Sequence, residues 1–111
     1  MLTSTPFNQL LLARCITAGD VVWHFHAQQR AVERGFAIAA VLTAIRTGEV
    51  IEDYSAERPR PTALVLGKTA GRVLHAVVAL DAAAEEAYII TLYEPDDARF
   101  LPPDFRTRKQ P

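Results

Sequence analysis

A histidine and two arginines recur at four-residue intervals in the segment from Trp23 to Gly35, W-H-F-H-A-Q-Q-R-A-V-E-R-G. In a helix this spacing places His26, Arg30 and Arg34 on one face. Because two neighbouring guanidinium groups repel each other, the arrangement makes most sense with an anion over it. Two interpretations stay open: the arginines bridge to carboxylates of the chain itself, or they bind a phosphodiester or another anion. The candidate carboxylates are Glu33, Glu52, Asp53, Glu94 and those of the C-terminal tail.

A second candidate group is His75, which lies among valines and leucines in an expected strand. We expect it to be at least partly buried, either as a hydrogen-bonded core residue or as an acid–base group. Thr91 and Tyr93 share one face of the last expected strand. Whether His75 joins them depends on the strand register, because a slip of one residue places it beside Ile90 and Leu92 instead.

Other kinds of chemistry find little support in the residues. The pair His24-x-His26 together with His75 matches no specific metal motif and no cysteine pair accompanies it, so we expect no metal site. The chain has no glycine-rich phosphate loop and no G-x-S-x-G elbow, and we expect no cofactor. The single cysteine, Cys15, is expected to be a small buried residue rather than a nucleophile.

Composition limits the class of protein. The chain of 111 residues, half of them hydrophobic, suits one domain with a single core. Its formal net charge of -1 gives no bulk attraction to nucleic acid or to an anionic membrane. We expect no secretion signal and no membrane-spanning segment, because the apolar runs are only as long as strands. With one cysteine, these features favour a cytoplasmic location.

Three helices are expected in the first half of the chain. The first runs from Pro6 to about Ala18, with Thr5 as its N-cap, and its apolar arc is wider than one core contact usually needs. Part of this arc either packs within the domain or forms a homodimer. The second runs from Phe25 or His26 to Arg34, with Gly35 in left-handed geometry after it and with Phe25, Val32 and Phe36 facing inward. The third spans residues 38–46.

The second half has the alternating pattern of strands. Expected strands span residues 49–54, 62–68, 72–80 and 87–93, and three consecutive short connections join them. The fold class is therefore α+β, with N-terminal helices packed on a four-stranded antiparallel meander. We divide the chain into an N-terminal helix (1–20), one α+β domain (21–95) and a C-terminal tail (96–111). In the tail, Phe100, Leu101 and Phe105 could pin it to the domain, and its basic cluster is Arg106, Arg108 and Lys109.

Several motifs in order resemble the domain-of-unknown-function 4258 family. The resemblance covers about Phe25 to Pro95 and includes the E-R-G signature at Glu33 to Gly35. The helix before Trp23 lies outside it. The motifs are H-A-Q-Q-R-A-V-E-R-G (26–35), G-E-V-I-E-D-Y (48–54), A-L-V-L-G (63–67), L-H-A-V-V (74–78) and Y-I-I-T-L-Y-E-P (88–95).

The resemblance implies a fold similar to that of small metal-independent ribonucleases such as RelE-type and colicin-type toxins. By that analogy His26 or His75 is the acid or base, Arg30 and Arg34 are phosphate ligands, and Tyr93 or Thr91 orients the substrate. The implied partners are RNA and an antitoxin-like protein. Two hypotheses stay open: a toxin-like endoribonuclease, and a non-catalytic domain that binds a protein partner or self-associates through its first helix.

Overall fold

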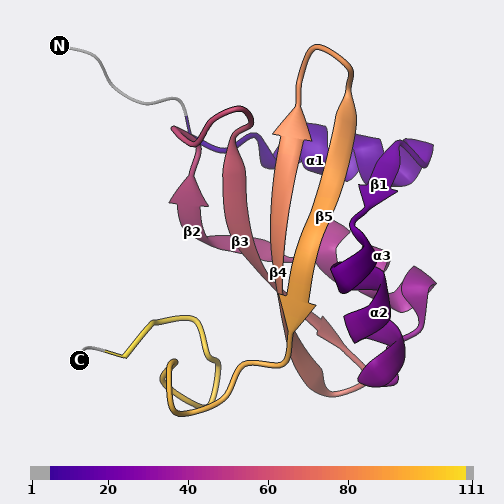
Figure 1. The fold of residues 1–111 in the computed structure, drawn as a ribbon. Helices are drawn as coiled ribbons and strands as arrows, with labels where there is room; N and C mark the ends of the chain where they lie inside the picture. Colours follow the sequence, from indigo (N-terminus) through magenta and orange to yellow (C-terminus); the bar gives the residue numbers. More distant parts are fainter. Residues whose placement is uncertain (1–5, 110–111) are drawn as a thin grey trace, which may run out of the picture.

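The helices precede the strands in the chain, except for one short strand between the first two helices. The computed structural model describes residues 6–109. Figure 1 shows the helices on one side of a twisted sheet and the C-terminal segment at the end where the last strand finishes. The elements are α1 (Gln9–Ala18), β1 (Val21–Trp23), α2 (Phe25–Glu33), α3 (Ile38–Arg46), β2 (Glu49–Tyr54), β3 (Thr62–Thr69), β4 (Arg72–Asp81) and β5 (Glu86–Tyr93).

The α+β class is confirmed, but the expected four-stranded antiparallel sheet is wrong in one respect. Strands β2 to β5 form the antiparallel meander, and β1 adds a fifth strand, so the sheet is mixed with the order β1-β5-β4-β3-β2. Strand β1 runs parallel to β5, with Val21 opposite Ala87 and Trp23 opposite Ile89. Three residues are too few to show an alternating pattern, and a parallel partner so distant in the chain leaves no local signal.

Helix α1 begins later than expected. It starts at Gln9 because the Asn8 side chain accepts a hydrogen bond from the Leu11 N–H, and Thr5, the expected N-cap, lies outside the described residues. Its large apolar side chains enter the core of its own domain, except for Leu10, which is 80% exposed. The wide apolar arc therefore serves mainly the packing of this helix on α3 and the sheet.

Helix α2 is confirmed within one residue at its end, and Gly35 follows it at φ +74° as expected. The expectation that Phe25 and Val32 face inward is wrong, because they are 73% and 70% exposed. The helix instead buries Ala27 and Ala31 completely. These small side chains let α2 lie close to β5 (Figure 1). The larger apolar residues Phe25 and Val32 are left on the exposed side of the helix.

The remaining elements agree closely with the pattern in the sequence. Helix α3 has the expected bounds, and the four meander strands differ from expectation by a residue or less at their ends. Ala70 and Gly71 form a two-residue turn between β3 and β4, and both have positive φ. A bulge between Val77 and Val78 sets the pairing of the β4–β5 hairpin.

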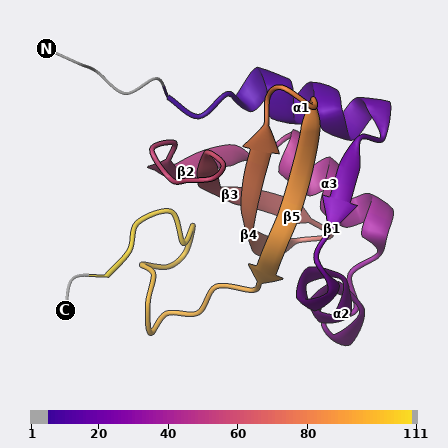
Figure 2. The ribbon, with the colours of Figure 1, turned by 45° about the horizontal axis from the view of Figure 1, so that its top comes forward.

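The two faces of the sheet have different coverings. Leu74 and Ala76 of β4 join the core formed with the helices, so His75 between them points to the opposite face. On that face the C-terminal segment packs against β4, and Phe100 is almost fully buried there. Figure 2 shows this segment in yellow at one side of the sheet, away from α1 and α3.

Candidate functional site

The helix face predicted from the sequence is present in the structure. His26, Arg30 and Arg34 are exposed on successive turns of α2, next to the buried residues Ala27 and Ala31. Within residues 6–109, the side chains of Arg30 and Arg34 make no ion pair and no hydrogen bond. These two cations are therefore open to solvent and to an anionic ligand.

The carboxylates expected to neutralise these arginines on the strands have other partners. Arg72 donates two hydrogen bonds to Glu94, at 3.1 and 2.7 Å. Arg108 donates two to Glu52, both at 2.9 Å. Asp53 accepts hydrogen bonds from the backbone N–H groups of Phe7 and Ser55. Among the described residues, Arg30 and Arg34 therefore do not form the ion pairs that one interpretation of the sequence expects.

Arg34 nevertheless lies in the electrostatic neighbourhood of Glu94. The pKa of Glu94 is lowered mainly by the hydrogen bonds from Arg72, and the positive charges of Arg72 and Arg34 add to the effect. Arg72 also donates a 2.7 Å hydrogen bond to the backbone carbonyl of Arg34 and stacks on the ring of Phe36. This contact fixes the end of α2 against the end of β5.

His75 and Tyr93 form the second group, and the structure brings them together. They are direct partners in the β4–β5 register, and the Tyr93 hydroxyl lies 3.3 Å from Nδ1 of His75. The other ring nitrogen, Nε2, lies 2.9 Å from the backbone carbonyl of Phe105. A carbonyl only accepts, so Nε2 carries the proton and the Tyr93 hydroxyl donates to Nδ1 of the neutral ring.

Burial controls the protonation of both residues. His75 is fully buried, and burial lowers the pKa of its imidazole, although the hydrogen bond to Phe105 opposes the shift. Burial likewise raises the pKa of the Tyr93 hydroxyl. Both groups are therefore uncharged near neutral pH. Thr91 lies opposite Val77, two residues from Tyr93, and makes no side-chain hydrogen bond among the described residues.

The C-terminal segment covers this pair. The ring of Phe100 meets the ring of His75 edge to face, with 4.5 Å between the centroids. Arg108 lies over the other side of the Phe100 ring while it binds Glu52. Arg106 binds Glu49 on β2 and Asp104 in the segment itself. The sequence indicated that the aromatic residues pin the tail, but not that its arginines pair with β2.

The sequence-predicted residues thus fall into two groups. His26, Arg30 and Arg34 share a face of α2, and His75 with Tyr93 lies under the C-terminal segment. Among residues 6–109 no hydrogen bond or ion pair joins the two groups. Sequence reasoning missed Glu52 and Arg108 as neighbours of His75. The available signal was the set of acidic residues in β2 and the alternation of Arg106 and Arg108 in the tail.

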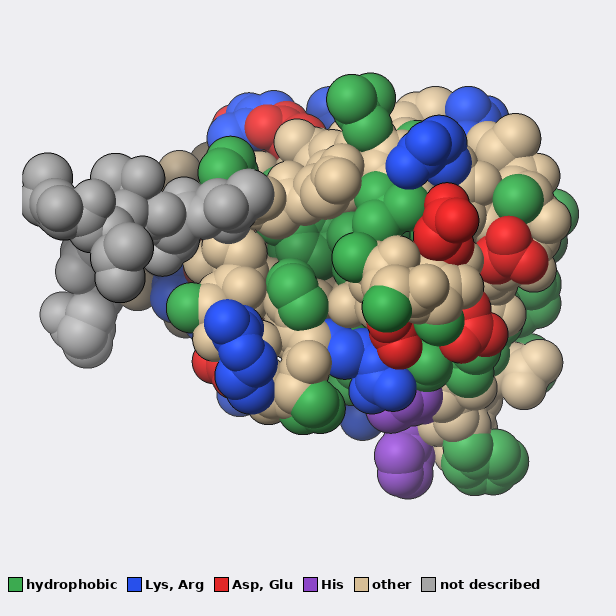
Figure 3. Space-filling view, turned by 90° about the horizontal axis from the view of Figure 1, so that it is seen from above, with side chains coloured by type: hydrophobic (Ala, Val, Ile, Leu, Met, Phe, Trp, Pro, Cys, Tyr) green, Lys and Arg blue, Asp and Glu red, His purple; other side chains and the backbone are tan. Residues whose placement is uncertain are grey.

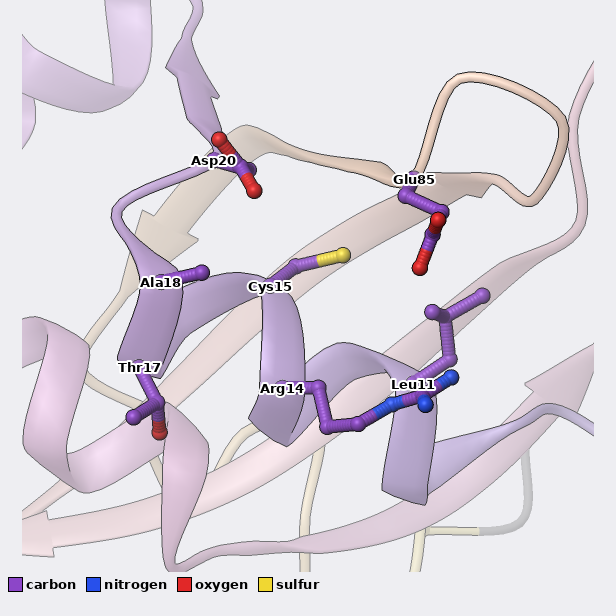
Figure 4. A pocket seen from close by; sticks show the side chains of 7 residues that line it. All are labelled: Leu11, Arg14, Cys15, Thr17, Ala18, Asp20 and Glu85. Carbon is purple, nitrogen blue, oxygen red and sulfur yellow. The ribbon is translucent and has the colours of Figure 1, made fainter.

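A pocket elsewhere on the molecule contains none of these residues. It has a volume of about 430 Å³ and lies between α1 and the β4–β5 turn. Figure 4 shows the sulfur of Cys15 pointing toward the side where Glu85 lies. Burial, and then the charges of Asp20 and Glu85, raise the pKa of the Cys15 thiol. Cys15 is buried, as expected, and its raised pKa keeps the thiol protonated near neutral pH.

Charges of both signs are mixed over the end of the molecule where this pocket opens. Figure 3 looks onto that end and shows basic and acidic side chains interspersed around a hollow floored by hydrophobic side chains. No single-sign field covers this face. This face therefore offers a polyanion no broad positive surface.

Two further observations concern the described residues. Among residues 6–109, no three His, Cys, Asp or Glu side chains are grouped so that they could hold a metal ion. In the same range, none of the helices has the length and apolar character needed to cross a bilayer.

Comparison with known proteins gives one match. The model of a family described as a domain of unknown function, DUF4258, matches residues 23–94. No curated protein and no solved structure matches the chain significantly. The matched region begins in β1 and ends just after β5, so it contains both α2 and the His75–Tyr93 pair. The chain therefore belongs to the DUF4258 family of domains of unknown function.

Proposed function

We propose that this domain is a toxin-like, metal-independent endoribonuclease that binds the phosphodiester of RNA on α2. One observation carries the proposal: Arg30 and Arg34 stand exposed one turn apart beside His26, while Glu52, Asp53 and Glu94 are bound by other groups. Two arginines one turn apart repel each other weakly in solvent, and a bound anion would relieve that repulsion. A phosphodiester supplies that anion and matches the planar donors of arginine.

The chemistry follows from the groups on this helix face. His26 acts as the general base and accepts the proton of a ribose 2′-hydroxyl, and the oxygen attacks the adjacent phosphorus. The bond from phosphorus to the 5′ oxygen breaks, and solvent protonates the departing oxygen. Arg30 and Arg34 stabilise the negative charge that grows on the phosphoryl oxygens. The products are a 2′,3′-cyclic phosphate and a 5′-hydroxyl.

The order of elements supports the proposal by analogy only. Helices followed by an antiparallel meander resemble the arrangement in RelE-type and colicin-type toxins, and a fold by itself does not define an activity. In this proposal His75 and Tyr93 do not touch RNA while the C-terminal segment covers them. The net charge of -1 also means that affinity has to come from the α2 arginines.

The experiment is cleavage of an end-labelled RNA by the purified full-length protein in the presence of a chelator. We expect products with 2′,3′-cyclic phosphate ends, and no cleavage where the scissile nucleotide is 2′-deoxy. His26→Gln should lower the rate by roughly 10²- to 10⁴-fold, the range for loss of an acid–base group. Arg30→Gln should lower it by roughly 10²-fold or more.

Arg46→Gln is the matched control, because Arg46 is an exposed arginine at the end of a different helix, α3. This variant removes the same charge and should cleave at the wild-type rate. Equal loss in the Arg30→Gln and Arg46→Gln variants would indicate general charge rather than a site. Intact RNA with well-folded wild-type protein, and no arrest of growth on induced expression, would refute the proposal.

A second candidate function, self-association, is favoured by the outer side of α2. Phe25 and Val32 are exposed and seven residues apart, so they lie on the same stripe with Gln28 and Gln29 between them. In a two-fold antiparallel pairing, Phe25 of one copy meets Val32 of the other, and the uncharged glutamines meet at the axis. The wide apolar arc of α1 offers less, because Leu10 is its only large apolar side chain that is exposed among the described residues.

A further inference from the structure

We infer that the C-terminal segment from Phe100 to Arg108 is a detachable strap that controls access to His75 and Tyr93. The observation that motivates this inference is the uneven strength of its attachments. Its centre is a buried aromatic contact, and its outer attachments are ion pairs at the surface. The inference does not depend on the proposed ribonuclease activity, because it concerns only whether the pair beneath can be reached.

The strap holds its own shape. Phe100 and Arg108 pair as an isolated antiparallel bridge, and the Leu101 N–H donates to the Thr107 carbonyl at 2.8 Å. The Phe105 N–H donates to the Leu101 carbonyl at 3.0 Å, and the Lys109 N–H to the Arg99 carbonyl at 2.7 Å. These internal bonds mean that the strap can leave the sheet as a unit without breaking its own turns.

The attachments of the strap to the sheet are few. At the centre, Phe100 covers the His75 ring and the Phe105 carbonyl accepts a hydrogen bond from Nε2 of His75. At the edge, Arg106 binds Glu49 and Arg108 binds Glu52, both on β2. Both partners of the Arg106–Glu49 pair are about half exposed, at 45% and 49%, so this pair contributes little and weakens as salt screens it. The Arg108–Glu52 pair is the stronger outer attachment, because it has two hydrogen bonds and the Glu52 side chain is only 18% exposed.

Displacement of the strap changes the chemistry of the face below it. It removes the Phe100 ring from His75 and frees the Nε2 proton from the Phe105 carbonyl. The Tyr93 hydroxyl, which points to His75, becomes accessible with it. Glu49 and Glu52 lose their arginine partners at the same time. The uncovered face therefore presents an imidazole, a phenol and two carboxylates.

Modification of histidine by diethyl pyrocarbonate, read by mass spectrometry on the full chain, tests the strap. His24 and His26 are exposed and serve as references within the same molecule. His75 should react much more slowly than either. In the Arg106→Gln/Arg108→Gln double variant we expect its rate, relative to His26, to rise by roughly 3- to 30-fold, because the two ion pairs that hold the edge of the strap on β2 are lost. High salt should raise the wild-type rate in the same direction.

The matched control is Arg99→Gln/Lys109→Gln. It removes two cations from the same segment, and neither side chain takes part in an ion pair or hydrogen bond among residues 6–109. In this variant the His75 rate should stay at the wild-type value. Thermal melting followed by circular dichroism checks the fold of both double variants, which should unfold at temperatures close to that of the wild type. The inference fails if His75 reacts as fast as His26 in the wild type, or if the two double variants protect His75 equally.

Discussion

At the scale of single residues, the decisive feature is a histidine held neutral by its surroundings. The Tyr93 hydroxyl donates to one nitrogen of His75, and the other nitrogen donates to the Phe105 carbonyl. The imidazole is fully buried, and both of its nitrogens are hydrogen-bonded in the neutral form. Because burial disfavours the charged form, the pKa of His75 lies below the usual 6.5. The same pair of bonds fixes the tautomer. His75 therefore stabilises the fold in its neutral form.

This state of His75 makes stability depend on pH. Because the folded-state pKa lies below the unfolded value of about 6.5, the unfolded chain binds the proton first. The contribution of His75 is complete above about pH 7 and is lost as the pH falls toward 5. Each unit of depression corresponds to about 1.4 kcal/mol. Urea unfolding of the wild type between pH 7 and 5 should show this loss.

His75→Gln should flatten the pH dependence in this window, because its amide keeps both hydrogen bonds and does not titrate. The variant is expected to be less stable at pH 7, and the diagnostic quantity is the slope. Glu49, Glu52 and Glu94 have lowered pKa values and affect stability only below about pH 4.5. His26→Gln is the control and should keep the wild-type slope. A wild-type stability that does not change from pH 7 to 5 would contradict the prediction.

At the scale of elements, α3 and β3 approach each other more closely than the apolar pattern indicates. Gly67 in β3 lies against the backbone of Ala44 in α3, where an added Cβ would be 2.5 Å from the carbonyl oxygen. A Cβ added at Gly48 would lie 2.8 Å from the same carbonyl oxygen. Glycines at both positions therefore permit the contact between this helix and the sheet, and the helical layer is positioned by it.

Gly67→Ala should test this contact. The new methyl group cannot fit without moving the helix backbone, so we expect a loss of roughly 1 to 3 kcal/mol in the free energy of unfolding. Lys68→Ala is the control, because Lys68 is the exposed neighbour on the same strand and should change stability by no more than about 0.5 kcal/mol. Thermal and urea unfolding measure both. Equal stability of the two variants would show that α3 can shift freely.

At the scale of the whole molecule, both candidate functions use α2 from different sides. Its flank beside the buried alanines carries His26, Arg30 and Arg34, and its outer side carries Phe25 and Val32. A single exposed apolar side chain is normal on a protein surface. Two of them on the same side of a helix form an apolar patch. The α2 helix lies next to β5 (Figure 1), and the residues on both of these sides are exposed.

Self-association through α2 predicts a concentration-dependent mass in sedimentation experiments. A single nine-residue helix contact is small, so the dimer should be weak and form only at high protein concentration. Phe25→Ser/Val32→Ser should abolish it without unfolding the domain, because both side chains are exposed. Leu10→Ser, on the exposed side of α1, should leave it intact. A monomer at every concentration, or loss with Leu10→Ser alone, would reject the α2 dimer.

How far the sequence predicts the structure differs between elements. Helix α3 and the meander strands follow from periodicity, because each has an apolar face long enough to show its repeat. Helix α2 shows the limit of that argument. Its bounds follow from composition and from Gly35, but Ala27 and Ala31 face the core in place of Phe25 and Val32. Close packing against β5 favours the smaller side chains. The separation between α2 and β5 cannot be inferred from the sequence of α2 alone.

The sequence by itself determined the α+β class, the DUF4258 resemblance and the common helix face of His26, Arg30 and Arg34, since these depend on local spacing. Tertiary structure decided the rest. Pairing of His75 with Tyr93 depends on a bulge in the register, and β1 joins β5 across most of the chain. The arginines that bind Glu49 and Glu52 come from the far end of the sequence. Such contacts join residues far apart in sequence, so no local pattern encodes them.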